Sequence, residues 1–147
     1  MNCMLEDEKR IGYEVKQLSC LIRYDFETQL SQQEVGVTCM QAWIIGYLSR
    51  NGQTPVYQRD LEHEFQIRGS SVTSLLKLME KNGLIVRSRV SHDARLKRLE
   101  LTPKAIEIHR KIQESIRQHE ERLRTGLTEE EVAVFFSVVH KIKQNLL

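Results

Sequence analysis

The sequence predicts a mainly α-helical chain with one small β-hairpin, in which two short helices and the hairpin lie between longer helices at both ends. Three observations predict this layout. Apolar residues recur every three or four positions near both ends of the chain, which is typical of one face of a helix. Residues 56–82 carry two shorter helical patterns separated by a break. Residues 84–101 are rich in β-branched residues and alternate in part, as strands do.

The first long helix is expected over about residues 7–33. Its apolar positions share one face and are Ile11, Val15, Leu18, Ile22, Phe26 and Leu30. A second helix is expected from Thr38 through Leu48, because Thr38 and Gln41 have the spacing of a capping box. In such a box, two side chains satisfy backbone groups that have no partner inside the helix.

Two short helical patterns follow. Tyr57, Leu61 and Phe65 are four residues apart, so they mark the apolar face of the first. The second runs over about residues 70–82 and ends at Gly83, because glycine is favoured just past a helix C-terminus. Its buried stripe is expected to hold Val72, Leu75, Leu76 and Met79. Its opposite face is polar and carries Ser70, Thr73, Ser74, Lys77 and Lys81.

The hairpin is expected to pair a strand over residues 84–90 with one over residues 96–101. The segment between them contains Asp93 and Arg95. The carboxylate of Asp93 could hold the guanidinium of Arg95 in one orientation. An oriented arginine on a thin hairpin suits the minor groove of DNA.

Positive charge is concentrated in this part of the chain. Residues 68–98 have a net charge of +6, whereas the whole chain is only +2 with histidine neutral. A polar helix face alone fits an ordinary solvent-exposed surface equally well. Its coincidence with the hairpin and the charge favours a phosphate partner, namely duplex DNA read by a winged helix-turn-helix.

These residues resemble the MarR family of winged helix-turn-helix regulators. The likeness runs without gaps from Leu61 to Thr102. Its most specific part is the end of the hairpin, the wing, with Asp93, Arg95, Leu101 and Thr102. Two positions depart from the family pattern. Ala94 stands where many members have another arginine, which could weaken wing contacts, and Ala105 stands where a glycine usually follows, at a helix start that alanine favours.

The resemblance implies one domain over residues 1–147, with a winged helix-turn-helix module at about 38–102. Dimerisation helices would then occupy about 7–33 and 103–147. Thr128 and Glu131 have capping-box spacing and predict the start of a last helix. Its wide apolar stripe is formed by Val132, Phe135, Phe136, Val139, Ile142 and Leu146. The stripe alone fits intramolecular packing as well as a dimer interface, whereas the resemblance implies a homodimer.

The predicted DNA-binding residues lie on the second short helix, the wing and the residues beside them. They are Arg68, Ser70, Ser71, Thr73, Ser74, Lys77, Arg87, Asp93, Arg95 and Lys97. A two-fold dimer predicts an inverted-repeat operator with half-sites one helical turn apart, roughly 10 base pairs. A repressor is expected, because blocking a promoter requires only occupancy.

Two kinds of signal could control DNA binding. The resemblance implies a small aromatic or amphipathic ligand between the dimerisation helices and the DNA module. The residues that could line its pocket, although their spacing equally fits core packing, are Phe26, Trp43 and Tyr47. The second signal is an oxidant acting on Cys20, as in a peroxide-sensing branch of the family. Arg23 could favour its thiolate and Tyr24 could hydrogen-bond to it, but Cys20 also fits a small buried hydrophobe.

Other function classes are disfavoured. The five histidines show no spacing typical of a zinc site, so neither an enzyme nor a metal or other cofactor is expected. No apolar run approaches the roughly 18 residues that span a bilayer, and the N-terminus is acidic, unlike a signal peptide. A cytoplasmic location without membrane contact is therefore expected. A winged-helix adaptor for proteins remains an alternative, although such a role gives no reason for the basic charge.

Overall fold

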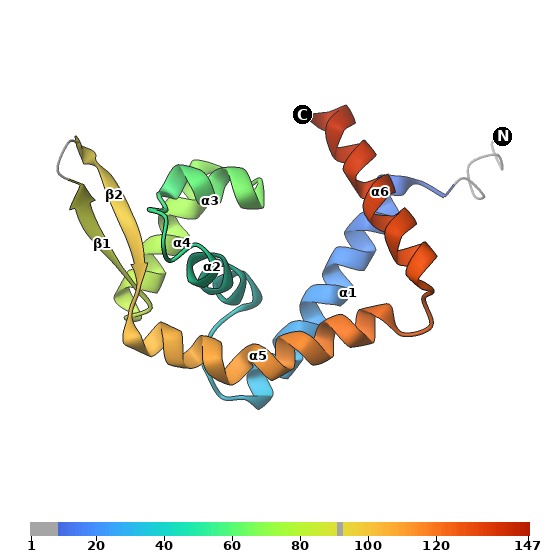
Figure 1. Ribbon diagram of the computed structural model, residues 1–147, viewed down its shortest axis with the longest axis horizontal. Helices are drawn as coiled ribbons and strands as arrows, with labels where there is room; N and C mark the ends of the chain where they lie inside the picture. The colour runs from blue at the N-terminus through green and yellow to red at the C-terminus, as the bar shows by residue number, and fades with distance from the viewer. Residues whose placement is uncertain (1–8, 91–92) are drawn as a thin grey trace, which may run out of the picture. The chain divides into compact units, whose positions relative to one another are not determined.

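The computed structural model describes residues 9–90 and 93–147. In this part of the chain, a two-stranded antiparallel hairpin is inserted among six helices, as predicted (Figure 1). The elements are α1 (Ile11–Gln32), α2 (Cys39–Arg50), α3 (Gln58–Phe65), α4 (Gly69–Lys81), β1 (Ile85–Val90), β2 (Asp93–Leu101), α5 (Pro103–Arg124) and α6 (Glu129–Leu146). They form two compact units, Met1–Gln113 and Glu114–Leu147, and α5 continues from the first into the second.

The predicted helix caps are present. The backbone N–H of Gln41 donates to Thr38 Oγ1 over 3.2 Å, and the backbone N–H of Thr38 donates to Gln41 Oε1 over 3.0 Å. At the start of α6, Thr128 Oγ1 accepts a hydrogen bond of 3.1 Å from the N–H of Glu131. The first helix begins at Ile11 rather than near residue 7. Its N-cap is Arg10, which lacks the short acceptor side chain that favours a helix start and brings positive charge to the positive end of the helix dipole.

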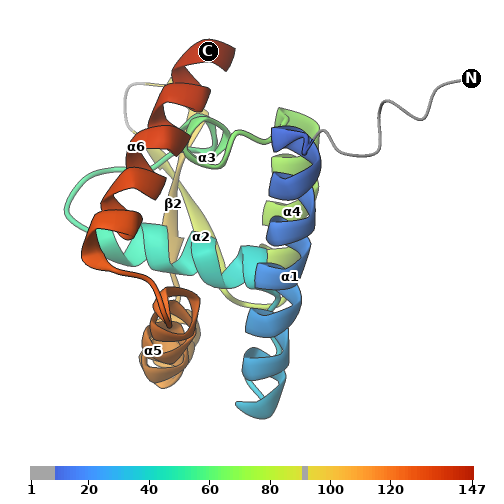
Figure 2. The ribbon, with the colours of Figure 1, turned by 90° about the vertical axis from the view of Figure 1, so that its right-hand side faces the viewer.

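The core of the first unit lies between α4 and its neighbours. Val72, Leu76 and Met79 are fully buried, and α4 packs against α3 and β1. Helix α2 contacts α1 and β2 in the same unit (Figure 2). Leu75, which was predicted to be buried with them, is only half-buried because it lies at the edge of this stripe. Leu78 is 47% exposed. The buried face therefore leaves the opposite face of α4 in solvent.

The hairpin is joined to the helices at its base. The pairing is regular from Ile85 opposite Leu101 to Arg89 opposite Lys97, and it becomes irregular beyond Arg89. The backbone N–H of Leu99 donates to the carbonyl of Val56 over 2.8 Å, which ties β2 to the segment before α3. This bond fixes the hairpin to the helix-turn-helix.

Thr102 closes the base of the hairpin. Its hydroxyl donates to the carbonyl of Gly83 over 2.6 Å, and its backbone N–H donates to the carbonyl of Leu84 over 3.1 Å. Gly83 has φ +71°, a left-handed conformation that glycine adopts at little cost after a helix. The chain thus enters and leaves the hairpin at one point.

The second unit contains the end of α5 and all of α6. The rings of Phe135 and Phe136 meet edge to face at 5.6 Å between centroids, and the guanidinium of Arg124 lies 6.0 Å from the ring of Phe136. Large apolar side chains of α6 are exposed: Val134 by 60%, Phe135 by 51% and Phe136 by 55%. None of the residues of α6 is buried.

Candidate nucleic-acid interface

The solvent face of α4 presents small polar and cationic side chains. Ser70, Ser71, Ser74 and Lys77 are all exposed there, and Arg68 is exposed at the N-cap. Short hydroxyl side chains allow a helix backbone to approach base edges and phosphates closely. The structure therefore brings five of the predicted DNA-binding residues to one accessible helix face.

Thr73 is placed differently from the other hydroxyl residues of α4. It is half-buried, and its hydroxyl accepts a hydrogen bond of 2.8 Å from Gln58 Nε2 at the start of α3 while donating one of 2.8 Å to the carbonyl of Gly69. Gln58 Nε2 also lies 3.3 Å from that carbonyl. Thr73 thus links the two helices. Gln58 is not among the predicted site residues, because no local pattern in the sequence joins residues 15 positions apart.

Gly69 allows a carboxylate to lie against the start of α4. A Cβ at this position would lie 2.3 Å from Glu62 Oε1. Glu62 Oε1 in turn lies 3.4 Å from Gln58 Nε2. A side chain at Gly69 would therefore require the Glu62 carboxylate to move.

One face of the hairpin changes from apolar at its base to cationic toward its tip. Ile85 and Leu99 are buried on this face. Arg87 is paired with Leu99, and Arg89 with Lys97. Side chains two positions apart, and those directly paired across strands, point to the same face of a hairpin, so these cations share the face that packs against α4.

Arg87 is held by an acidic residue of α4. Its Nε lies 2.9 Å from Glu80 Oε2, and the side chains are 20% and 51% exposed, respectively. Arg87 Nε and Nη2 are both buried, and neither makes a hydrogen bond of normal geometry with the described residues, so Nε and Glu80 form an ion pair only. No local pattern in the sequence predicts this pair.

Asp93 contacts the backbone of Arg95 and not its guanidinium. Asp93 Oδ1 accepts a hydrogen bond of 2.8 Å from the backbone N–H of Arg95, and no ion pair joins the two side chains in the described chain. Short acidic side chains commonly bond to a backbone N–H two residues further along. Asp93 therefore shapes the start of β2, whereas the exposed Arg95 side chain is not oriented by it as predicted.

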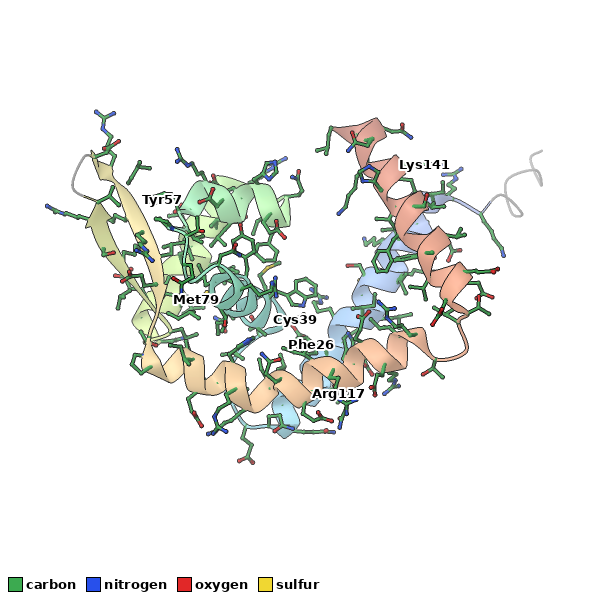
Figure 3. All side chains as sticks on the ribbon, viewed as in Figure 1. Phe26, Cys39, Tyr57, Met79, Arg117 and Lys141 are labelled. Atoms are coloured by element: carbon green, nitrogen blue, oxygen red, sulfur yellow. The ribbon has the colours of Figure 1, made fainter. Side chains whose placement is uncertain are left out.

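Two surface cavities adjoin this face of the hairpin. The first, of about 510 Å³, is lined by Lys77, Glu80, Lys81, Arg87 and Lys97. The second, of about 240 Å³, is lined by Tyr57, Gln58, Arg59, Arg87, Arg95, Leu96, Lys97 and Leu99. In the second, the guanidinium of Arg59 lies 5.3 Å from the centre of the Tyr57 ring, at the start of α3 (Figure 3). A third cavity, of about 400 Å³, lies between the end of α2 and the base of the hairpin.

The residues proposed for a ligand pocket occupy three different environments. Phe26 is 2% exposed in the core, and Trp43 is 44% exposed. The ring of Tyr47 meets that of Phe65 edge to face at 5.9 Å. None of the three lines the cavities described above. Phe26 and Tyr47 thus make packing contacts in this structure.

The cysteines differ in their surroundings. Cys20 is half-buried, while the guanidinium of Arg23 lies 5.2 Å from the centre of the Tyr24 ring. Cys39 is 2% exposed at the start of α2 (Figure 3). Burial raises the pKa of the Cys39 thiol from 9.0 to about 11, and the nearby Glu27 carboxylate adds to this rise. The charge of Arg23 partly offsets it, so Arg23 acts on Cys39.

The described residues contain neither a metal-binding cluster nor a membrane-spanning helix. In residues 9–90 and 93–147, no group of three or more His, Cys, Asp or Glu side chains is placed to hold a metal ion. Over the same residues, every helix is too short or too polar to cross a bilayer. His92 and Cys3 lie outside these residues.

Comparison with known proteins agrees with this geometry. A sequence model of the MarR family matches residues 35–96. The transcription regulator MarR from Oenococcus oeni PSU-1 is 32% identical, with a TM-score of 0.77 over 92% of this chain and 99% of that chain. The Staphylococcus aureus MepR–DNA complex is 26% identical, with a TM-score of 0.87 over 95% of this chain and 100% of that one. PcaV from Streptomyces coelicolor, solved with its natural ligand, shares the fold at 19% identity, with a TM-score of 0.82 over 95% of each chain.

Proposed function

Because this chain belongs to the MarR family of transcriptional regulators, we propose that it binds an inverted-repeat DNA operator as a homodimer and represses transcription there. The observation that carries the proposal is that the first unit exposes both a small polar helix face, on α4, and a cationic hairpin. The small polar face of α4 suits the major groove, and the hairpin that carries the exposed Arg95 suits the minor groove. The similar MepR has been solved bound to DNA.

Exposed apolar side chains support the homodimer. On α1, Ile11, Val15 and Leu21 are 63%, 56% and 66% exposed, and α6 exposes Phe135 and Phe136. Several large apolar side chains left exposed along one helix are typical of a surface that another chain covers. A second copy of the same chain would cover it with two-fold symmetry, which the inverted repeat of the operator would mirror.

Release from DNA by a small aromatic or amphipathic ligand is the form of control that we propose. This proposal is based on membership of the MarR family. Among the predicted pocket residues, Trp43 has an exposed side chain that a ligand could reach. A cytoplasmic location follows from the proposed role. Oxidation of Cys20 is the alternative. If peroxide releases the parent from DNA but does not release Cys20→Ser, oxidation rather than ligand binding is the signal.

The experiment that tests the proposal is binding to genomic DNA fragments, including the region upstream of the protein's own gene. Binding should be measured over a range of salt concentrations with nonspecific competitor present. Arg95→Ala should weaken binding, and Lys77→Ala should lower the slope of log affinity against log salt by about 0.9, the value for one phosphate. Lys111→Ala removes an exposed charge from α5 and serves as the matched control. Absent or salt-insensitive binding by a folded dimer would favour the protein-adaptor alternative.

A further inference from the structure

The two cavities beside the hairpin share a cationic wall. Arg87 and Lys97 line both of them. Each cavity also has cations of its own, which are Lys77 and Lys81 in the first and Arg59 and Arg95 in the second. The cations come from α3, α4 and both strands, so the fold gathers them from segments far apart in the sequence.

We infer that the two cavities bind neighbouring phosphates of one DNA strand, with Arg87 and Lys97 between them. The inference rests on the proposed function and deepens it. It adds Arg59 and Lys81 to the interface and assigns Arg87 to the DNA backbone rather than to a base. A strand that passes from the groove occupied by α4 to the groove occupied by the wing would cross the surface between these two elements.

The chemistry of the lining favours a phosphodiester over an organic ligand. Every residue that lines the first cavity is charged, four positive and one negative. Pockets for drug-sized ligands are instead lined mainly by apolar and aromatic side chains. Guanidinium and ammonium groups bind phosphate oxygens through charge-assisted hydrogen bonds, and a guanidinium can make two of them in parallel.

Arg87 has unused capacity for such a bond. In the free protein its guanidinium faces Glu80, with Nε and the carboxylate oxygen 2.9 Å apart, and its buried Nη2 has no hydrogen-bond partner in the described chain. A buried donor without a partner is unfavourable. A phosphate in either cavity would give the guanidinium an acceptor once the side chain turns from Glu80.

The test uses the full-length protein and a fluorescein-labelled duplex of unrelated sequence, because backbone contacts do not depend on sequence. Fluorescence anisotropy gives affinity between about 50 and about 200 mM KCl. Arg59→Gln and Lys81→Gln each remove one exposed cation from one cavity. Each should lower the slope of log affinity against log salt by about 0.9. A fourfold rise in KCl should then weaken the binding of each variant about 3.5-fold less than it weakens the binding of the parent. Lys111→Gln makes the same charge change on α5 and should leave the slope unchanged.

Double variants test the shared wall. Arg59→Gln and Lys81→Gln should have additive effects on affinity, because these residues line different cavities. Each should be non-additive with Arg87→Gln, because residues that contact the same group couple. Additive effects for all pairs would overturn the shared site. Circular dichroism and thermal unfolding show whether each variant remains folded.

The outcomes separate this inference from the proposed function. If the parent binds no duplex, both fail. If the parent binds and the slopes of Arg59→Gln and Lys81→Gln equal that of Lys111→Gln, only the phosphate subsites fail. Inorganic pyrophosphate, titrated calorimetrically into the DNA-free protein, identifies the other source of phosphate. Saturable binding that both variants abolish, with an unchanged DNA slope, would assign the cavities to a free polyphosphate and overturn the inference.

Discussion

Cys39 should be almost unreactive in the folded protein. Burial raises its thiol pKa from 9.0 to about 11, and the side chain is 2% exposed. The thiolate is the species that reacts with alkylating agents, and a rise of two pH units lowers its fraction about 100-fold at neutral pH. We therefore expect alkylation of native Cys39 to be at least about 100-fold slower than alkylation of the same residue in the urea-unfolded chain.

The assay is iodoacetamide labelling followed by mass spectrometry at about pH 8, in a background that carries Cys3→Ser and Cys20→Ser. Between pH 9 and about 11 the labelling rate of the folded protein should go on rising about tenfold per pH unit, whereas that of the unfolded chain should level off, because the pKa of the thiol is about 11 in the folded protein and 9.0 without burial. Folding stability should fall over the same interval, since the unfolded thiol ionises at lower pH than the folded one. Labelling of folded Cys39 within tenfold of the unfolded rate would refute this reasoning.

Three further predictions concern the packing of α4, the base of the hairpin and the charge next to Arg87. Leu76→Ala should lower the free energy of unfolding by about 3 kcal/mol because Leu76 is fully buried, and Leu78→Ala by less than about 1 kcal/mol because Leu78 is 47% exposed. Urea denaturation at one protein concentration measures the free energy of unfolding of both variants. Equal losses of stability would mean that the face of α4 that carries Leu76 is not the buried one. Thr102→Ala should cost about 1–2 kcal/mol in the same assay, because the hydroxyl can no longer donate to the Gly83 carbonyl or accept from the N–H of Ala105; an unchanged midpoint would contradict this. Glu80→Gln should strengthen binding to nonspecific duplex about threefold by freeing the paired arginine, with little effect from Glu107→Gln on α5; weaker binding by Glu80→Gln would show that Glu80 positions the arginine for DNA.

The fold could be predicted from the sequence because its determinants are local. The apolar spacing on α4, the box of Thr38 and Gln41, and Gly83 after α4 each act within a few residues. The resulting elements lie where predicted, with small differences at their ends. The start of α1 was placed too early, because an apolar stripe does not reveal the lack of a favourable cap at Arg10.

The site could be predicted only as a surface. Nothing local joins Gln58 to Thr73 or Arg87 to Glu80, since each contact depends on how separate elements pack. Asp93 had two possible partners in Arg95, the guanidinium and the backbone N–H, and a sequence does not distinguish them. The DNA-binding role of the individual residues stays a prediction.

The closed base of the hairpin has a consequence for how this protein can change. The bonds from Thr102 to Gly83 and Leu84 bring both ends of residues 84–101 to one place, and the bond from Leu99 to Val56 fixes the direction in which the hairpin leaves. A segment that starts and ends at one fixed point can be exchanged as a unit. The wing can therefore be exchanged for one of different length or charge while α4 keeps its place, so the two surfaces that we propose for DNA binding can evolve separately.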